Sequence, residues 1–105
     1  QPSFFKVTFV ANGEEHFGKC LDISGGGMFI ESQAELSAGT SVELSFNLPG
    51  GLATPINCRA EISWLNRKPN PMKPHYPHGL GLMFVALPEA VHKAILRLSD
   101  TRKST

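Results

Sequence analysis

Two segments of the chain alternate strictly between apolar and polar residues, and this alternation limits the possible folds more than any other feature. A β-strand places successive side chains on opposite faces, so the apolar residues of such a segment share one face. These residues are Val42, Leu44, Phe46 and Leu48 in segment 41–48, and Ile56, Cys58, Ala60, Ile62 and Trp64 in segment 56–64. Pro49-Gly50-Gly51 between them has the chemistry of a turn. The pattern predicts a hairpin with one buried face and one solvated face.

Four shorter segments carry weaker strand patterns. They contain Phe5, Val7 and Phe9; Phe17, Lys19, Leu21 and Ile23; residues 28–31; and Leu80, Leu82 and Phe84. In the second segment all four residues are expected to share a face, with Lys19 at a barrel end. Even spacing of strands between turn residues predicts a small antiparallel barrel or sandwich. Its core is expected to include Phe4, Phe5, Phe17, Met28 and Phe29.

The end of the chain has a helical pattern. Val91, Ile95 and Leu98 recur at the spacing of one helix face, and Pro88 and Glu89 suit a first helical turn. We expect a helix at about residues 88–99 that docks on a barrel at about residues 4–86, within one domain covering residues 1–105. Segment 66–78, which holds four prolines, is expected to be a long connecting loop.

The composition excludes several classes of function. Ten Lys and Arg against nine Asp and Glu give a formal charge of +1, which provides no broad cationic face for polymeric nucleic acid. The chain has no apolar run near the ~20 residues of a membrane span, so we expect no membrane insertion. Cys20 and Cys58 form no CxxC pair and are expected to be buried free thiols, which favours a cytoplasmic location.

The titratable residues show no arrangement typical of catalysis or of a metal site. His75 and His78 are the only histidines close together in the sequence, and a metal ion would need two further ligands. No cysteine and histidine are spaced as nucleophile and base, and Asp22 and Glu31 are separated by a turn and by alternating faces. We therefore expect no enzymatic activity and no cofactor.

Residues 22–30 read Asp-Ile-Ser-Gly-Gly-Gly-Met-Phe-Ile, and the three consecutive glycines need an explanation because they contribute no packing. They supply either a positive φ for a sharp corner or room for a ligand at the backbone. In the second case Asp22 and Ser24 could hydrogen-bond a purine edge or a ribose. The alternative is a plain barrel corner that Asp22 and Ser24 cap. No lysine or helix pattern follows, so the segment is not a phosphate-binding loop of the Walker type.

The same segment resembles a motif of known proteins. Asp22-x-Ser24-x-x-Gly27 is similar to the (Asp or Asn)-x-Ser-x-x-Gly motif of PilZ domains, which are bacterial receptors for cyclic di-GMP. The resemblance covers nearly the whole chain. Its other parts are Gly39-Thr40-Ser41-Val42-Glu43-Leu44 at the family's third-strand entry, Trp64 as the bulky residue ending the next strand, and Gly79-Leu80-Gly81-Leu82-Met83-Phe84 as the family's Gly-x-Gly-x-x-Phe strand.

The resemblance implies an all-β fold, a six-stranded antiparallel barrel with one C-terminal α-helix. It also implies cyclic di-GMP as the ligand, with Asp22 and Ser24 at the guanine edges and Gly27 keeping the corner free of a side chain. The full set of expected ligand-binding residues is Asp22, Ser24, Gly25, Gly26, Gly27, Gly79 and Gly81.

One element of the family pattern is missing. PilZ domains that bind cyclic di-GMP also carry Arg-x-x-x-Arg just before the first strand, whereas no arginine precedes Arg59 here. Either the sequence starts just after that motif, or the chain is a degenerate member. Arginine meets phosphate bidentately and stacks on guanine, so this sequence holds half of a binding site. Lys6, Arg59 and Arg67-Lys68 are the available substitutes, and solvated surface charge is the alternative role of each.

Two functions remain at this stage. The first is a sensory module that binds cyclic di-GMP at the Asp22–Gly27 corner and then changes its contact with a protein partner or a fused effector domain. The second is an adaptor of the same fold that binds no nucleotide and acts through protein contacts, for instance in motility or pilus assembly. Both a monomer and a homodimer fit the family.

Overall fold

The computed structural model describes residues 5–47, 55–67 and 77–103. Six strands and a helix follow one another along these residues. They are β1 (Phe5–Ala11), β2 (Glu14–Ile23), β3 (Gly27–Glu31), β4 (Ser41–Phe46), β5 (Ile56–Asn66), β6 (Gly79–Ala86) and α1 (Glu89–Lys103).

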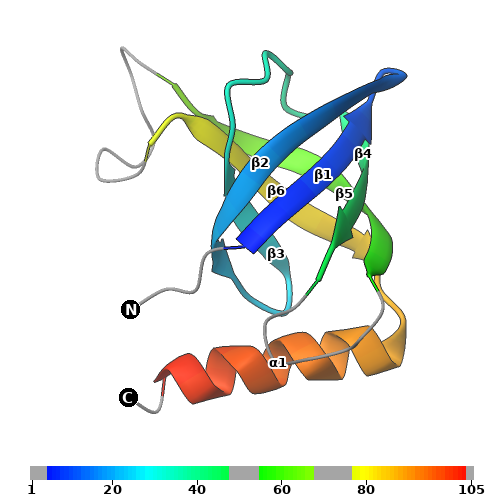
Figure 1. The fold of residues 1–105 in the computed structure, drawn as a ribbon, viewed down its shortest axis with the longest axis vertical. Helices are drawn as coiled ribbons and strands as arrows, with labels where there is room; N and C mark the ends of the chain where they lie inside the picture. Colours follow the sequence, from blue (N-terminus) through cyan, green and yellow to red (C-terminus); the bar gives the residue numbers. More distant parts are fainter. Residues whose placement is uncertain (1–4, 48–54, 68–76, 104–105) are drawn as a thin grey trace.

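The strands form a closed antiparallel barrel in the order β1-β2-β3-β6-β5-β4, and α1 crosses one end of it (Figure 1). Pairing between β1 and β4 closes the barrel, so no strand of the described part is left with an unpaired edge. The predicted six-stranded antiparallel barrel with a C-terminal helix is confirmed. The hairpin prediction is also confirmed at the level of pairing, because β4 and β5 are antiparallel neighbours from Ser41↔Glu61 to Phe46↔Ile56.

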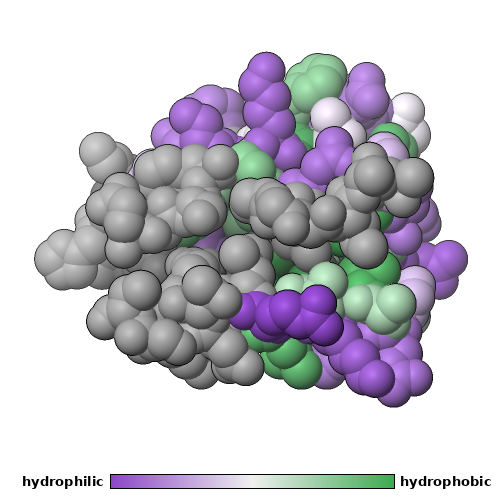
Figure 2. Space-filling view, turned by 60° about the horizontal axis from the view of Figure 1, so that its bottom comes forward, coloured by the Kyte–Doolittle hydropathy of each residue, from purple (hydrophilic) through white to green (hydrophobic). Residues whose placement is uncertain are grey.

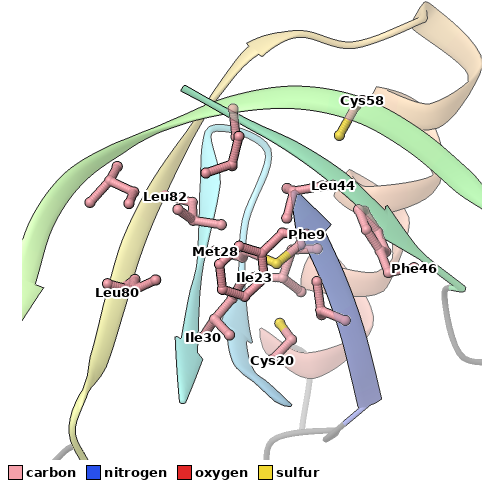
Figure 3. Packing of buried hydrophobic residues seen from close by; sticks show 14 of the residues in the cluster. Phe9, Cys20, Ile23, Met28, Ile30, Leu44, Phe46, Cys58, Leu80 and Leu82 are labelled. Atoms are coloured by element: carbon pink, nitrogen blue, oxygen red, sulfur yellow. The ribbon is translucent and has the colours of Figure 1, made fainter. Parts of the chain in front are cut away.

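The barrel interior holds the core that the alternation predicts (Figure 3). The alternating residues of β4 and β5 are buried from Val42 to Phe46 and from Ile56 to Ile62, and β1 contributes Val7 and Phe9. Val91 and Ile95 of α1 join the same cluster, so the helix covers the barrel end with its apolar face. Figure 2 looks toward this end, where hydrophobic residues show between hydrophilic ones.

A β-bulge in β2 contradicts the predicted face of that strand. The pairing with β3 shifts between Cys20 and Asp22, which leaves Leu21 as an extra residue. Before the shift Cys20 faces the core and Phe17 and Lys19 face outward; after it Ile23 faces the core. Phe17 is 68% exposed, so its predicted place in the core is wrong. The inner position beside it is Gly18, where a side chain would overlap Ile30.

A second bulge, in β5, contradicts the predicted inward position of Trp64. The pairing with β6 shifts between Ile62 and Trp64, so Ile62 pairs with the buried Leu82 but Trp64 pairs with Gly81. Leu65, next in the chain, packs against the core in its place. Trp64 therefore lies on the outer face of the barrel. A strict period of two cannot reveal an inserted residue, and this is why the sequence misplaced the indole.

The ends of the elements differ modestly from prediction. Helix α1 runs to Lys103, beyond the expected end at residue 99, and β5 extends to Asn66. The buried Asn66 amide donates a hydrogen bond of 2.9 Å to the Pro77 carbonyl and so ties the end of β5 to the start of β6. Phe4, Leu48, the turn at 49–51, most of loop 66–78 and the side chain of Leu98 lie outside the described residues. In the described part of the chain, no helix is long and apolar enough to cross a bilayer.

The buried thiols give a first test of this core. Cys20 and Cys58 are buried thiols that form no disulfide, and burial together with nearby Glu43 raises the pKa of Cys58 from 9.0 to about 11. At pH 8 only about one thousandth of Cys58 would be thiolate, the reactive form. We expect an aromatic disulfide reagent to modify neither cysteine in the native protein and both in urea. Between pH 9.0 and 11 the Cys58 thiol ionises more readily in the unfolded chain than in the folded one. The free energy of unfolding should therefore fall as the pH rises through this range. Fast modification of the native protein would contradict this packing.

Candidate functional site

The glycine-rich segment forms a tight connection between β2 and β3, at the barrel end that α1 crosses (Figure 1). The Ser24 amide donates to the Gly27 carbonyl at 2.9 Å and closes the turn. The Ser24 hydroxyl oxygen accepts a longer bond of 3.4 Å from the Gly26 amide. The Gly26 carbonyl accepts from the Phe84 amide at 2.9 Å, which ties the turn to β6. These bonds hold the backbone of the corner in one shape.

None of the three glycines has a positive φ, and two of them allow close approach of other parts of the chain. Within the described residues, the glycines with positive φ are Gly13 and Gly39, so the left-handed corner considered from the sequence is not formed. A Cβ at Gly27 would overlap the Leu82 carbonyl oxygen. A Cβ at Gly25 would lie 2.8 Å from Leu96 Cδ2 and 3.1 Å from His92 Nε2. Two of the glycines thus make room for β6 and α1.

Gly26 differs from its two neighbours. A Cβ there would meet no atom within 4 Å, so the packing of the chain gives no reason for a glycine at this position. Gly26 is exposed and borders the hollow described below. Open space above a bare backbone is the arrangement that lets a ligand approach closely.

On the outer face of the barrel, one row of residues crosses four neighbouring strands. Asp22 of β2 pairs with Phe29 of β3, Phe29 pairs with Gly81 of β6, and Gly81 pairs with Trp64 of β5. The rings of Phe29 and Trp64 stack across β6 with centroids 5.2 Å apart and planes at 20°. Both bulges are needed for this row, because a regular strand would turn Asp22 and Trp64 toward the core.

Gly79 and Gly81 explain how two large rings meet across a strand. A Cβ at Gly81 would overlap the Trp64 indole, and one at Gly79 would lie 2.6 Å from the tip of the Phe29 ring. The Gly-x-Gly spacing places both bare positions on the outer face of β6. These glycines, predicted from the family resemblance to bind ligand, lie beneath the stacked rings and support them.

A hollow lies between the glycine corner and the stacked rings. Its lining consists of Asp22, Ile23, Ser24, Gly26, Gly27, Met28, Phe29, Ser63, Trp64, Leu82 and Met83. The structure thus brings together four of the seven residues expected from the sequence. Gly25 faces α1, and Gly79 and Gly81 do not line the hollow.

The sequence missed the β5 side of this hollow. Ser63 and Trp64 line it because the bulge turns Trp64 outward, and the Ser63 hydroxyl donates to the Gly81 carbonyl at 3.3 Å. Phe29 was expected in the barrel core, yet it is buried on the outer face under Trp64. The sequence signal for this wall was Ser63 followed by Trp64 at the end of an alternating strand. That signal does not show whether the indole faces the core or the outside.

The charge of the hollow comes from Asp22, because no lysine or arginine is among its lining residues in the described part of the chain. The cations considered as substitutes for the family's arginines lie elsewhere. Arg59 is 3.4 Å from Glu43, and Arg67 is 3.3 Å from Glu35 and also donates to the Leu36 carbonyl. Lys6 is exposed on β1, and Lys68 is outside the described residues.

A pair of alanine variants tests the role of the glycine corner. Gly27→Ala should lower the free energy of unfolding by about 1–3 kcal/mol, because the new methyl group would overlap the Leu82 backbone. Gly26→Ala meets open space and should change it by under about 1 kcal/mol. Urea denaturation followed by circular dichroism measures both, and equal losses in the two variants would contradict the geometry.

Comparisons with known proteins agree with this architecture. The family model "PilZ domain" matches residues 2–100. The crystal structure of the PilZ domain of CeSA from a cellulose-synthesizing bacterium has a similar fold, with a TM-score of 0.62 over 98% of this chain and 96% of that one at 19% sequence identity. None of the curated proteins is similar enough to this chain to count as a match. With the barrel, the helix and the Asp22–Gly27 corner in place, the match over nearly the whole length shows that this chain belongs to the PilZ domain family.

Proposed function

We propose that this PilZ domain binds cyclic di-GMP in the hollow between the β2–β3 corner and Trp64. The observation that carries the proposal is the joint placement of a carboxylate, an open glycine backbone and a partly exposed indole around one hollow. Asp22 and Gly26 belong to one segment at the end of β2, whereas Trp64 belongs to β5, and two bulges are needed to bring Asp22 and Trp64 to one outer row. PilZ domains are in general receptors for this nucleotide, which makes it the first ligand to test.

Asp22 and Ser24 suit a guanine edge. An ionised carboxylate only accepts hydrogen bonds, and guanine presents N–H donors on its Watson–Crick edge. The Ser24 hydroxyl both donates and accepts, and it is exposed at the corner next to Gly26. The open space at Gly26 leaves room for a base to reach both groups.

Trp64 suits a base face. An aromatic side chain offers a stacking surface to any base, typically worth about 1–3 kcal/mol. Phe29 backs the indole from the barrel side at 5.2 Å, which fixes the plane of the ring before a ligand arrives. Met83, 49% exposed, borders the same hollow with a flexible apolar side chain.

The two phosphates of the nucleotide require cations, and none lines the hollow in the part of the chain that the structure describes. The proposed complex therefore takes its cations from residues outside the described lining. In this view the domain is a cytoplasmic, non-catalytic sensor whose bound nucleotide changes its contact with a protein partner or a fused effector domain. An adaptor that binds no nucleotide is the competing function, and the titration below separates the two.

Titration of the full-length native protein with cyclic di-GMP tests the proposal. We expect calorimetric heat and a parallel change in the fluorescence of Trp64, the single tryptophan of the chain, at ligand concentrations up to about 50 µM. The fluorescence change reports on the hollow itself because the indole lines it. A folded protein that gives neither signal would be the adaptor.

Alanine substitutions at the corner test whether the nucleotide binds there. Asp22→Ala should weaken binding by about tenfold to a hundredfold, the usual value of a charge-assisted hydrogen bond, and Ser24→Ala should weaken it by about tenfold or less. Glu15→Ala is the matched control, since Glu15 is an exposed carboxylate on the same strand and does not line the hollow. If Asp22→Ala binds as tightly as Glu15→Ala while both remain folded, the nucleotide binds elsewhere.

A further inference from the structure

Phe17 stands apart from the other phenylalanines of the barrel. Phe9, Phe29 and Phe46 are each 1–3% exposed, whereas Phe17 is 68% exposed on the outer face of β2. A single exposed apolar residue is common on protein surfaces, but aromatic residues are enriched at interfaces, so the surroundings of this ring decide whether it is a contact site.

Phe17 borders a hollow that differs from the nucleotide site. Strands β1 and β2 lie side by side at the front of the barrel in Figure 1, and Thr8 pairs with Phe17 while Lys6 pairs with Lys19. The hollow is lined by these four residues, by Val7 and Gly18 between them, and by Glu31, Ser32 and Gln33 at the end of β3 and just after it. The Ser32 hydroxyl donates to the Phe17 carbonyl at 3.2 Å and holds that wall in place. No residue is shared with the hollow at Asp22 and Trp64.

The two lysines of this surface form no ion pair with any residue that the structure describes. Within the described residues, Arg59, Arg67 and Lys93 each lie 3.3–3.6 Å from a glutamate, whereas neither Lys6 nor Lys19 has a carboxylate within ion-pair distance. Glu31 is the register neighbour of Lys19 but forms no ion pair with it. Like charges on directly opposite residues of paired strands repel each other, and a bound anion would relieve this.

We propose that this surface, made of Lys6, Thr8, Phe17, Lys19, Glu31 and Gln33, binds an acidic segment of another protein, because its two lysines outnumber its single carboxylate. The segment would place an apolar side chain on the Phe17 ring and carboxylates beside Lys6 and Lys19. A second copy of the chain fits poorly, because a two-fold contact would bring the lysine pair of one copy against that of the other. A hollow beside a single ring also suits a protruding side chain better than the flat surface of a membrane.

Peptide selection tests the chemistry of the partner without assuming its identity. A displayed library of random 12-residue peptides would be selected on the wild-type chain and counter-selected on Phe17→Thr. Threonine keeps the strand propensity at an exposed position, so this variant should stay folded. We expect the surviving peptides to be rich in Asp and Glu around one aromatic or aliphatic residue. Survivors without an acidic excess would overturn the proposal.

Binding of one synthetic survivor then locates the surface. Nuclear magnetic resonance with the labelled chain should show shifts at Lys6, Thr8, Phe17 and Lys19. Phe17→Thr should weaken binding at least tenfold, and Lys6→Gln with Lys19→Gln should weaken it at least tenfold and flatten its dependence on salt. Val85→Thr on β6 is the matched control, because Val85 is 52% exposed and lies outside this surface, and it should bind as the wild type does.

Three results would contradict the acidic partner. The first is shifts confined to other residues, with unchanged affinity in the Phe17 and lysine variants. The second is a concentration-dependent dimer in sedimentation velocity that Phe17→Thr abolishes, which would assign the surface to a second copy. The third is flotation of the chain with phosphatidylglycerol vesicles that Phe17→Thr abolishes, which would assign it to a membrane. Because the two hollows share no residue, loss of peptide binding would leave the cyclic di-GMP titration unchanged, and the two proposals fail separately.

Discussion

Closure of the barrel is the constraint on which the outer surface of this domain depends. Once β1 pairs with β4, each strand has one face turned to a filled interior and one face turned outward. A regular strand would turn Asp22 inward with Cys20, and Trp64 inward with Ile62. Extra residues at Leu21 and Ser63 reverse the alternation at these two points and bring both side chains to the outside. The candidate site therefore exists because two strands depart from regularity.

The glycines of the chain show how a small barrel makes room for such a site. Gly81 and Gly79 leave the outer face of β6 bare, and the stacked rings of Phe29 and Trp64 fill that space. Because Gly27 has no side chain, its backbone can lie in close contact with β6, so the same sheet fixes the corner and the rings. Gly26 has no such neighbour and, unlike Gly13 and Gly39, no positive φ, so neither packing nor backbone conformation accounts for a glycine there.

Charge divides the outer surface into two regions of different chemistry. The hollow at the corner carries a carboxylate and an indole and draws no cation from its described lining. The hollow on β1 and β2 carries an exposed ring beside two paired lysines that form no ion pair with described residues. The two ligands proposed for these surfaces, a nucleotide edge and an acidic peptide, differ accordingly, and because the hollows share no residue the two proposals do not exclude each other.

The sequence by itself determined the fold class, the inner faces of β1, β4 and most of β5, and the corner of Asp22, Ser24 and three glycines. Those features depend on local periodicity and on a contiguous motif, which a single chain displays directly. It placed Phe17 and Trp64 wrongly, because a bulge changes the register without any mark in the apolar pattern. It also placed Phe29 wrongly, because Met28, Phe29 and Ile30 are all apolar and buried, so the pattern does not show that Phe29 faces away from the core. Only the tertiary structure decided that the rings of Phe29 and Trp64 stack over Gly79 and Gly81. It also decided that Trp64 and Asp22 lie in one outer row. These contacts join strands that are distant in the sequence. They depend on the register in which the strands pair, and no local sequence pattern encodes that register.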